Sequence, residues 1–197
     1  MGVAAWTAAA HAWCDRGIIR GPIGTRQAAG AKAGPTVPGG KAPISLEAIV
    51  IQAGQGKALS LRGTQVAYKA EGQRPAGGPT FLEFTAAPGF NTGDHIHRQI
   101  EEIFYVVEGE FQIRAGDRSL RAKPGDFVLV PPGVPHGFAN PVGGPAKMVL
   151  LISPAGVHER YFEELAAILA KPGPPDVQAI AALRKRYDTE QVSPLST

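Results

Sequence analysis

Three histidines and one glutamate lie in two short segments of the sequence, at spacings that could surround one metal ion. His95 and His97 are two residues apart, so in a β-strand their side chains share one face. Glu102 and His136 belong to separate segments, which a fold with two facing β-sheets could bring together. Imidazole and carboxylate groups bind Fe, Mn, Ni, Co, Cu or Zn, and the spacing does not choose among them. The sequence therefore predicts one divalent transition metal held by these four residues.

Glycine, proline and asparagine residues recur around the four candidate ligands in two blocks of fixed spacing. The first block consists of Gly89, His95, His97, Glu102 and Gly109. The second block consists of Gly125, Pro131, Gly133, His136 and Asn140. Position by position, the blocks are similar to the two consensus motifs of the cupin superfamily, and the resemblance covers residues 43–197. It implies an all-β fold, the cupin double-stranded β-helix, which is a jelly-roll barrel.

The segment of residues 101–107 resembles small single-domain cupins that are often compared with quercetin 2,3-dioxygenases. In that family the enolate or phenolate oxygen of the substrate binds the metal, and the glutamate ligand accepts the substrate proton. The resemblance therefore implies that Glu102 is the catalytic base. The expected function is that of a metal-dependent dioxygenase for a small phenolic, flavonol-like or β-diketone substrate, and the expected assembly is a homodimer.

Two other functions agree with the same residues. One is a non-oxidative enzyme, an isomerase or a polyketide-cyclase-like protein, in which the ion only polarises a carbonyl group. The other is a cupin that binds a small molecule without catalysis, because one fold hosts many functions. Residues 1–42 lack the periodicity of a helix-turn-helix segment, which argues against a regulator that binds DNA.

Short runs with strand character, separated by turn signals, fill residues 43–153 and are typical of a sandwich or barrel. The expected strands are Ile44–Ile51, Gln65–Lys69, Thr80–Ala86, Asp94–His97, Glu102–Val107, Glu110–Ala115, Arg118–Arg121, Phe127–Val130, His136–Asn140 and Lys147–Ile152. Alternation along these strands places apolar side chains on the faces that carry Glu102 and His136. They are either core residues only or also substrate-binding residues. These candidates are Leu82, Phe84, Phe104, Val106 and Phe138.

Residues 154–197 have a different pattern, with apolar residues at a period near 3.6. The stripes run from Tyr161 to Leu169 and from Val177 to Tyr187, and they predict two short amphipathic helices that pack on the barrel. His158, near the start of the first helix, is expected on the surface.

Residues 1–42 are rich in Ala, Gly and Pro and are expected to be disordered or poorly ordered. They carry a net charge of +4, whereas residues 43–197 have a net charge of −1 and so no basic bias, which gives +3 for the whole chain. We therefore expect no nucleic-acid partner. No apolar run is long enough for a membrane span, and Cys14 is the only cysteine, so a cytoplasmic protein without an intrachain disulfide is expected.

Overall fold

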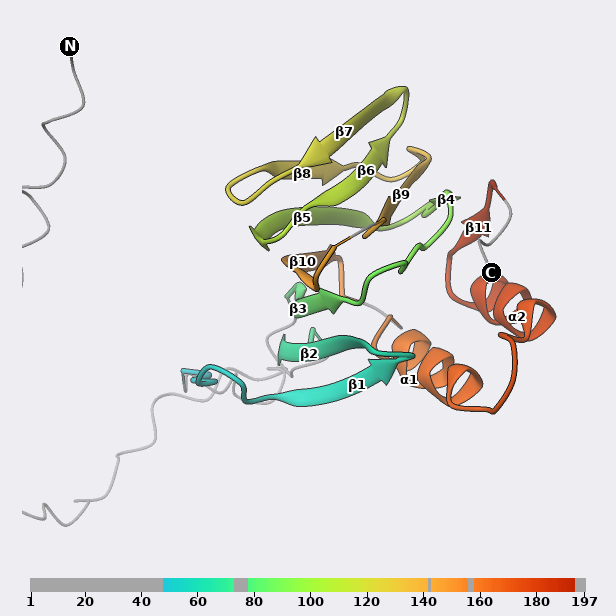
Figure 1. The fold of residues 1–197 in the computed structure, drawn as a ribbon, viewed down its shortest axis with the longest axis horizontal. Helices are drawn as coiled ribbons and strands as arrows, with labels where there is room; N and C mark the ends of the chain where they lie inside the picture. Colours follow the sequence, from blue (N-terminus) through green and yellow to red (C-terminus); the bar gives the residue numbers. More distant parts are fainter. Residues whose placement is uncertain (1–47, 73–77, 142, 156–157, 194–197) are drawn as a thin grey trace, which may run out of the picture. The chain divides into compact units, whose positions relative to one another are not determined.

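The computed structural model describes residues 48–72, 78–141, 143–155 and 158–193. The extension expected at residues 1–42 lies outside the described residues. Within the described residues, most elements are β-strands, arranged in two antiparallel sheets with two helices after them (Figure 1). The all-β double-stranded β-helix that the sequence predicts is confirmed.

The two sheets have six and five strands. The first contains, in spatial order, β1 (Lys57–Leu61), β2 (Thr64–Ala70), β3 (Thr80–Ala86), β10 (Ala146–Ser153), β5 (Glu101–Glu108) and β8 (Phe127–Val130). The second contains β11 (Glu190–Gln191), β4 (His95–Ile96), β9 (His136–Ala139), β6 (Phe111–Ala115) and β7 (Arg118–Ala122). Strands that are distant in sequence become neighbours, as when β10 lies between β3 and β5.

The core lies between the sheets and follows from the period of two along each strand. In β10 every second residue is buried, from Ala146 to Ile152. Leu150 of β10 lies opposite Leu82 of β3 on one side and Phe104 of β5 on the other. All three side chains are buried, so the facing residues of neighbouring strands form one continuous apolar layer.

The turn between β5 and β6 depends on a glycine. Gly109 has φ of 71°, in the left-handed region that glycine adopts without strain. A Cβ atom there would also lie only 2.9 Å from the Cα of Ala146. Any larger residue at position 109 would therefore strain the turn and push β10 away from β5.

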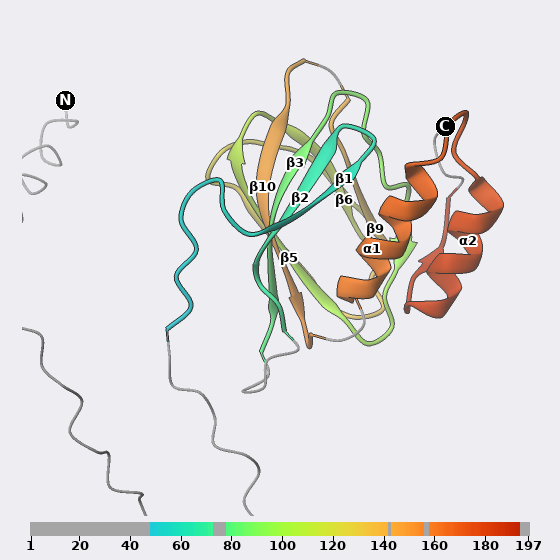
Figure 2. The ribbon, with the colours of Figure 1, turned by 90° about the horizontal axis from the view of Figure 1, so that it is seen from below.

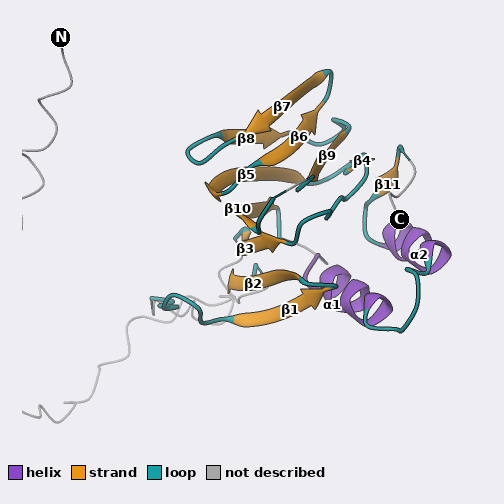
Figure 3. Cartoon of the chain, in the orientation of Figure 1, coloured by secondary structure: helices purple, strands orange, loops and turns teal. Residues whose placement is uncertain are grey.

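The two expected helices are present as α1 (His158–Leu169) and α2 (Val177–Arg186). The carboxylate of Asp176 caps α2 by accepting a hydrogen bond from the backbone N–H of Ala179 at 2.9 Å. The helices lie side by side next to the barrel, with α1 against β1 (Figure 2), and they are the only helices in the described residues (Figure 3). Neither is long and apolar enough to cross a membrane.

The first strand differs from the sequence prediction. Residues 44–47 of the expected strand Ile44–Ile51 lie outside the described residues, and residues 48–51 are an exposed loop. The chain instead enters the sheet at β1, which turns into β2 through Arg62 and Gly63, both at positive φ. Such a turn matches the twist of a hairpin, but Arg-Gly is a weaker sequence signal than Asn-Gly or Asp-Gly. Residues 48–51, the described part of the apolar run before it, pair with no strand.

Candidate metal centre

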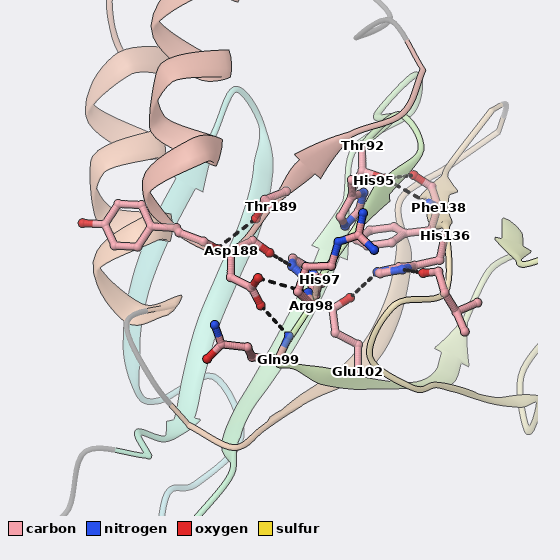
Figure 4. Close-up of polar contacts among 12 residues, drawn as sticks. Thr92, His95, His97, Arg98, Gln99, Glu102, His136, Phe138, Asp188 and Thr189 are labelled. Atoms are coloured by element: carbon pink, nitrogen blue, oxygen red, sulfur yellow. Dashed lines mark hydrogen bonds and ion pairs between the residues drawn. The ribbon is translucent and has the colours of Figure 1, made fainter.

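The four predicted ligands come from three neighbouring places in the fold. His95 lies in β4, directly opposite His136 of β9, and His97 follows β4 on the same face as His95. Glu102 lies in β5 of the other sheet. All four side chains are buried, and their potential ligand atoms lie within 4.8 Å of one another (Figure 4). Residues separated by up to 41 positions in the sequence therefore meet at one point between the two sheets.

Each histidine is oriented by a backbone carbonyl group. The Nδ1 atom of each ring lies at hydrogen-bond distance from a carbonyl oxygen, which can only accept, so Nδ1 carries the proton. The Nε2 atom of each ring is then left as the ligand atom. The acceptors are Gly93 for His95 at 3.0 Å, Asp188 for His97 at 2.7 Å and Val134 for His136 at 2.9 Å.

A close backbone approach holds the acceptor of His95 in place. Gly137, the residue after His136, lies so near β4 that a Cβ atom would be 2.7 Å from the carbonyl oxygen of Gly93. Because only glycine has no Cβ, this position lets the two histidine-bearing strands come together.

Glu102 places one carboxylate oxygen near each of two histidines. Oε2 lies 3.2 Å from Nε2 of His136, and Oε1 lies 3.4 Å from Nε2 of His97. Burial opposes ionisation of this carboxylate, but in the metal-free protein its interactions with the rings of His136 and His97 outweigh burial and hold its pKa well below the usual range. Glu102 is therefore ionised, the form that binds a cation.

Burial has a large effect on His95. It lowers the pKa of this imidazole to about 3, with a further contribution from His136. The pKa of His97 is raised instead, since the nearby Glu102 outweighs the opposing effect of burial. His95 is therefore neutral at physiological pH, as a metal ligand must be.

These residues fit a divalent transition metal. Three imidazole nitrogens and one carboxylate oxygen converge, each imidazole is fixed through its other nitrogen, and the carboxylate is ionised. His95, His97, Glu102 and His136 could thus hold one ion, and the donor set does not distinguish among Fe, Mn, Ni, Co, Cu and Zn.

A cavity of about 290 Å³ adjoins the candidate centre, and His95, His97 and Glu102 are part of its wall. Much of the wall is aromatic: Phe84 packs edge-on against Phe90 and Phe138, with ring centroids 5.3 Å apart in both pairs. Such a wall favours a flat, largely apolar ligand.

The predicted substrate-binding residues fall into two groups. Phe84 and Phe138 line the cavity, and their contact with substrate stays a prediction. Leu82, Phe104 and Val106 are buried in the core between the sheets and are not among the lining residues. Alternation along a strand assigns a face correctly, but it does not tell which part of that face borders a cavity.

The helices close the other side of the cavity, which the sequence analysis did not assign to the site. The lining residues from this side include His158, Tyr161, Leu165, Ile180 and Arg184. His158 was expected on the surface, but it is only 2% exposed and its ring lies 5.1 Å from that of His97. The signal was present in the spacing, because positions 158, 161 and 165 share one helix face.

Asp188 ties the loop after α2 to the ligand loop after β4. Its backbone carbonyl orients His97, and its carboxylate accepts the backbone N–H groups of Arg98 and Gln99 at 3.0 and 2.9 Å (Figure 4). It has φ of 51°, which aspartate tolerates better than most residues. No sequence motif signalled this role, because the contact spans about ninety positions of the chain.

Comparison with known proteins agrees with the motifs. Residues 82–152, which include all four candidate ligands, match the family model described as Cupin domain. The chain is 32% identical over 71 residues to an uncharacterized protein of Methanocaldococcus jannaschii, and 31% identical over 70 residues to the HTH-type transcriptional regulator PuuR of Escherichia coli. Each match covers 36% of this chain, but only 57% and 38% of those relatives.

Among solved structures, the polyketide cyclase RemF from Streptomyces resistomycificus is similar, with a TM-score of 0.48 and 25% identity. The likeness covers 54% of this chain and 79% of that one. The family match, the two motif blocks and the two facing sheets agree that residues 82–152 form a domain of the cupin superfamily.

Proposed function

We propose that this protein is a metal-dependent dioxygenase that acts on a small phenolic, flavonol-like or β-diketone molecule. The observation that carries the proposal is the junction of two features: a buried group of three histidines and a glutamate, and an aromatic-walled cavity that begins at this group. A bound transition metal would supply Lewis acidity and, if redox-active, electron exchange with dioxygen.

The residues of the chain would bind the metal, orient the substrate and accept its proton. His95, His97, Glu102 and His136 would hold the ion, and the aromatic wall would orient a planar substrate and exclude water from it. Glu102 is ionised and lines the cavity, so its carboxylate oxygen could take the proton of an enol or phenol. This base role follows the resemblance to quercetinase-like cupins.

A non-oxidative enzyme, an isomerase or polyketide-cyclase-like protein, is the second candidate, and His158 favours it. Neither ring nitrogen of this buried residue has a hydrogen-bond partner within the described residues, and the side chain lines the cavity beside His97. It could therefore hydrogen-bond a second substrate oxygen while the first lies on the metal. Such two-point polarisation of a carbonyl compound promotes enolisation or ring closure without oxygen.

Metal analysis combined with oxygen uptake distinguishes these functions. We would measure the metal content of the purified protein and of H95A and H136A, and oxygen consumption with quercetin as the probe. Near-stoichiometric metal that both variants lose, together with oxygen uptake, supports the dioxygenase. Metal with turnover that is unchanged under anaerobic conditions supports the isomerase or cyclase. Binding of quercetin without turnover under either condition indicates a small-molecule-binding cupin, and absence of metal after reconstitution contradicts the site itself.

We also propose a homodimer. The outer face of the six-stranded sheet exposes large apolar side chains on β3, β5 and β8, including Phe81, Tyr105, Val107, Phe127 and Leu129. A second copy would remove this apolar area from water. Light scattering at micromolar concentration is expected to give twice the mass of the chain, and a monomer alone would contradict the proposal.

A further inference from the structure

A buried guanidinium group lies in the helical wall of the cavity. Arg184 of α2 is only 6% exposed and lines the cavity. It donates from Nη2 to the carbonyl oxygen of Thr92 at 2.9 Å and from Nη1 to the side-chain oxygen of Gln191. Both acceptors are neutral, and in the described part of the chain no hydrogen-bond partner is found for its Nε atom. Arg184 is thus partly bonded, but its charge is not matched by these contacts.

No carboxylate among residues 48–72, 78–141, 143–155 and 158–193 forms an ion pair with Arg184. The phenol of Tyr161 also interacts with Arg184 through a side-chain hydrogen bond, but it does not neutralise the guanidinium, because burial raises the pKa of this phenol more than Arg184 lowers it. A buried charge without a counter-charge is costly, so its presence beside a cavity indicates that a ligand supplies the counter-charge.

The other charges around the cavity agree with an anionic ligand. Glu102 is the only carboxylate among the lining residues, and it belongs to the candidate metal centre. Arg62, the second lining arginine, donates to the backbone carbonyls of Leu169, Lys171 and Gly173. With one carboxylate against two guanidinium groups, the cavity wall is net positive before any metal is added, and a divalent ion would make it more so.

We propose that Arg184 binds a carboxylate group of the substrate, so that the substrate is a small aromatic or enolic acid rather than a neutral phenol. The inference deepens the proposed function, on which it rests for the second contact, the substrate oxygen at the metal. The guanidinium keeps a free donor in Nε, and a hydrogen bond between two charged groups is about twice as strong as one between neutral groups. The carboxylate would complete the charge balance of the helical wall.

The test uses two probes of nearly the same shape, 2-hydroxybenzoate and its neutral amide, 2-hydroxybenzamide. Their affinities would be measured by calorimetry on the full-length protein, both zinc-loaded and metal-free, since zinc has no redox chemistry. The variants are R184Q and, as the matched control on the same helix, R186Q, whose exposed side chain pairs with Glu164. Thermal melting and zinc content are recorded for each protein.

The expected result is that the wild-type protein and R186Q bind the acid about tenfold or more tightly than the amide, and that R184Q loses this preference. Equal affinities in the wild-type protein would overturn the inference. A preference that persists in folded R184Q would also overturn it, because the metal or another group would then hold the carboxylate.

Two further measurements keep the outcome decisive. If R184Q does not fold, the metal-free wild-type protein decides, because a preference for the acid there cannot come from a metal and its absence contradicts the inference. Zinc content reports separately on the proposed metal site. A protein that binds no zinc but prefers the acid would refute the proposed function and support the role of Arg184.

Discussion

The two walls of the cavity are built by opposite rules. On the strand side, every imidazole is fixed through Nδ1 and the carboxylate contacts two of these rings, so each polar group has a partner. On the helical side, His158 and Arg184 are as deeply buried, yet both ring nitrogens of His158 and the Nε atom of Arg184 lack hydrogen-bond partners within the described residues. Buried polar groups normally have hydrogen-bond partners. We therefore infer that the strand wall holds the metal and that the unpartnered groups of the helical wall contact the ligand.

The sharpest test of this contrast replaces one histidine of each wall by alanine. We expect H136A to lose metal, with an affinity lower by about 1,000-fold or more, because one of four ligands disappears from a buried site. We expect H158A to keep its metal, because His158 is outside the ligand group. Elemental analysis after dialysis measures both. Equal loss of metal in both variants would show that the helical wall is part of the centre.

A smaller effect is expected where the two walls are joined. D188A removes the carboxylate that accepts the N–H groups of Arg98 and Gln99. It also leaves an alanine at positive φ, where no side-chain hydrogen bond offsets the backbone strain, so the loop that carries His97 should become less rigid. Metal affinity is expected to fall about 10- to 100-fold, as for other partners that orient a ligand. E190Q is the control, because Glu190 is an exposed residue that pairs with Arg98. Titration with zinc measures both, and an unchanged affinity in D188A would mean that β4 alone fixes His97.

The histidines of both walls should make the metal-free protein sensitive to acid. Burial lowers the pKa of His158 to about 4 and that of His95 to about 3, from 6.5. Between these values and pH 6.5 the unfolded chain binds more protons, so stability falls as the pH decreases. Below pH 4.5 Glu102 adds to the loss of stability, because this carboxylate takes up a proton more readily in the unfolded chain than in the folded protein, where its pKa is well below 4.5. The raised pKa of His97 acts in the opposite direction.

Replacing His158 isolates its share of this effect. Relative to the wild-type protein, H158Q is expected to lose about 2 kcal/mol less stability between pH 8 and pH 5, as a histidine with this shift requires. Urea denaturation of the metal-free proteins at both pH values measures the difference. Identical pH profiles would mean that His158 is solvated in the folded protein, contrary to its burial beside His97.

The sequence predicts the strand wall far better than the helical wall, for a physical reason. The spacing of His95 and His97 fixes a shared face through the period of a strand, and the motif glycines mark turns such as Gly109, so local rules suffice there. The role of Asp188 and the burial of Arg184 depend on contacts with residues about ninety positions away. A helical period places a residue on a face of its helix, but it does not tell what that face covers.

The first strand shows the same limit at a smaller scale. Residues 48–51 have strand propensity but pair with no strand among the described residues, whereas the less apolar segment Lys57–Leu61 pairs with β2 through a two-residue turn. Whether a segment with strand propensity forms a strand depends on the strands and side chains next to it, and for an edge strand the sequence gives little information about these neighbours.

The most direct test of the central claim is a crystal structure of the metal-loaded protein with anomalous scattering measured at the absorption edge of the metal. The account predicts one strong peak, about 2.0–2.2 Å from the Nε2 atoms of His95, His97 and His136 and from an oxygen of Glu102, with His158 and Arg184 outside the coordination sphere. A loaded crystal with no peak there, or with a peak bound instead by His158, would contradict the division between a strand wall that holds metal and a helical wall that binds ligand.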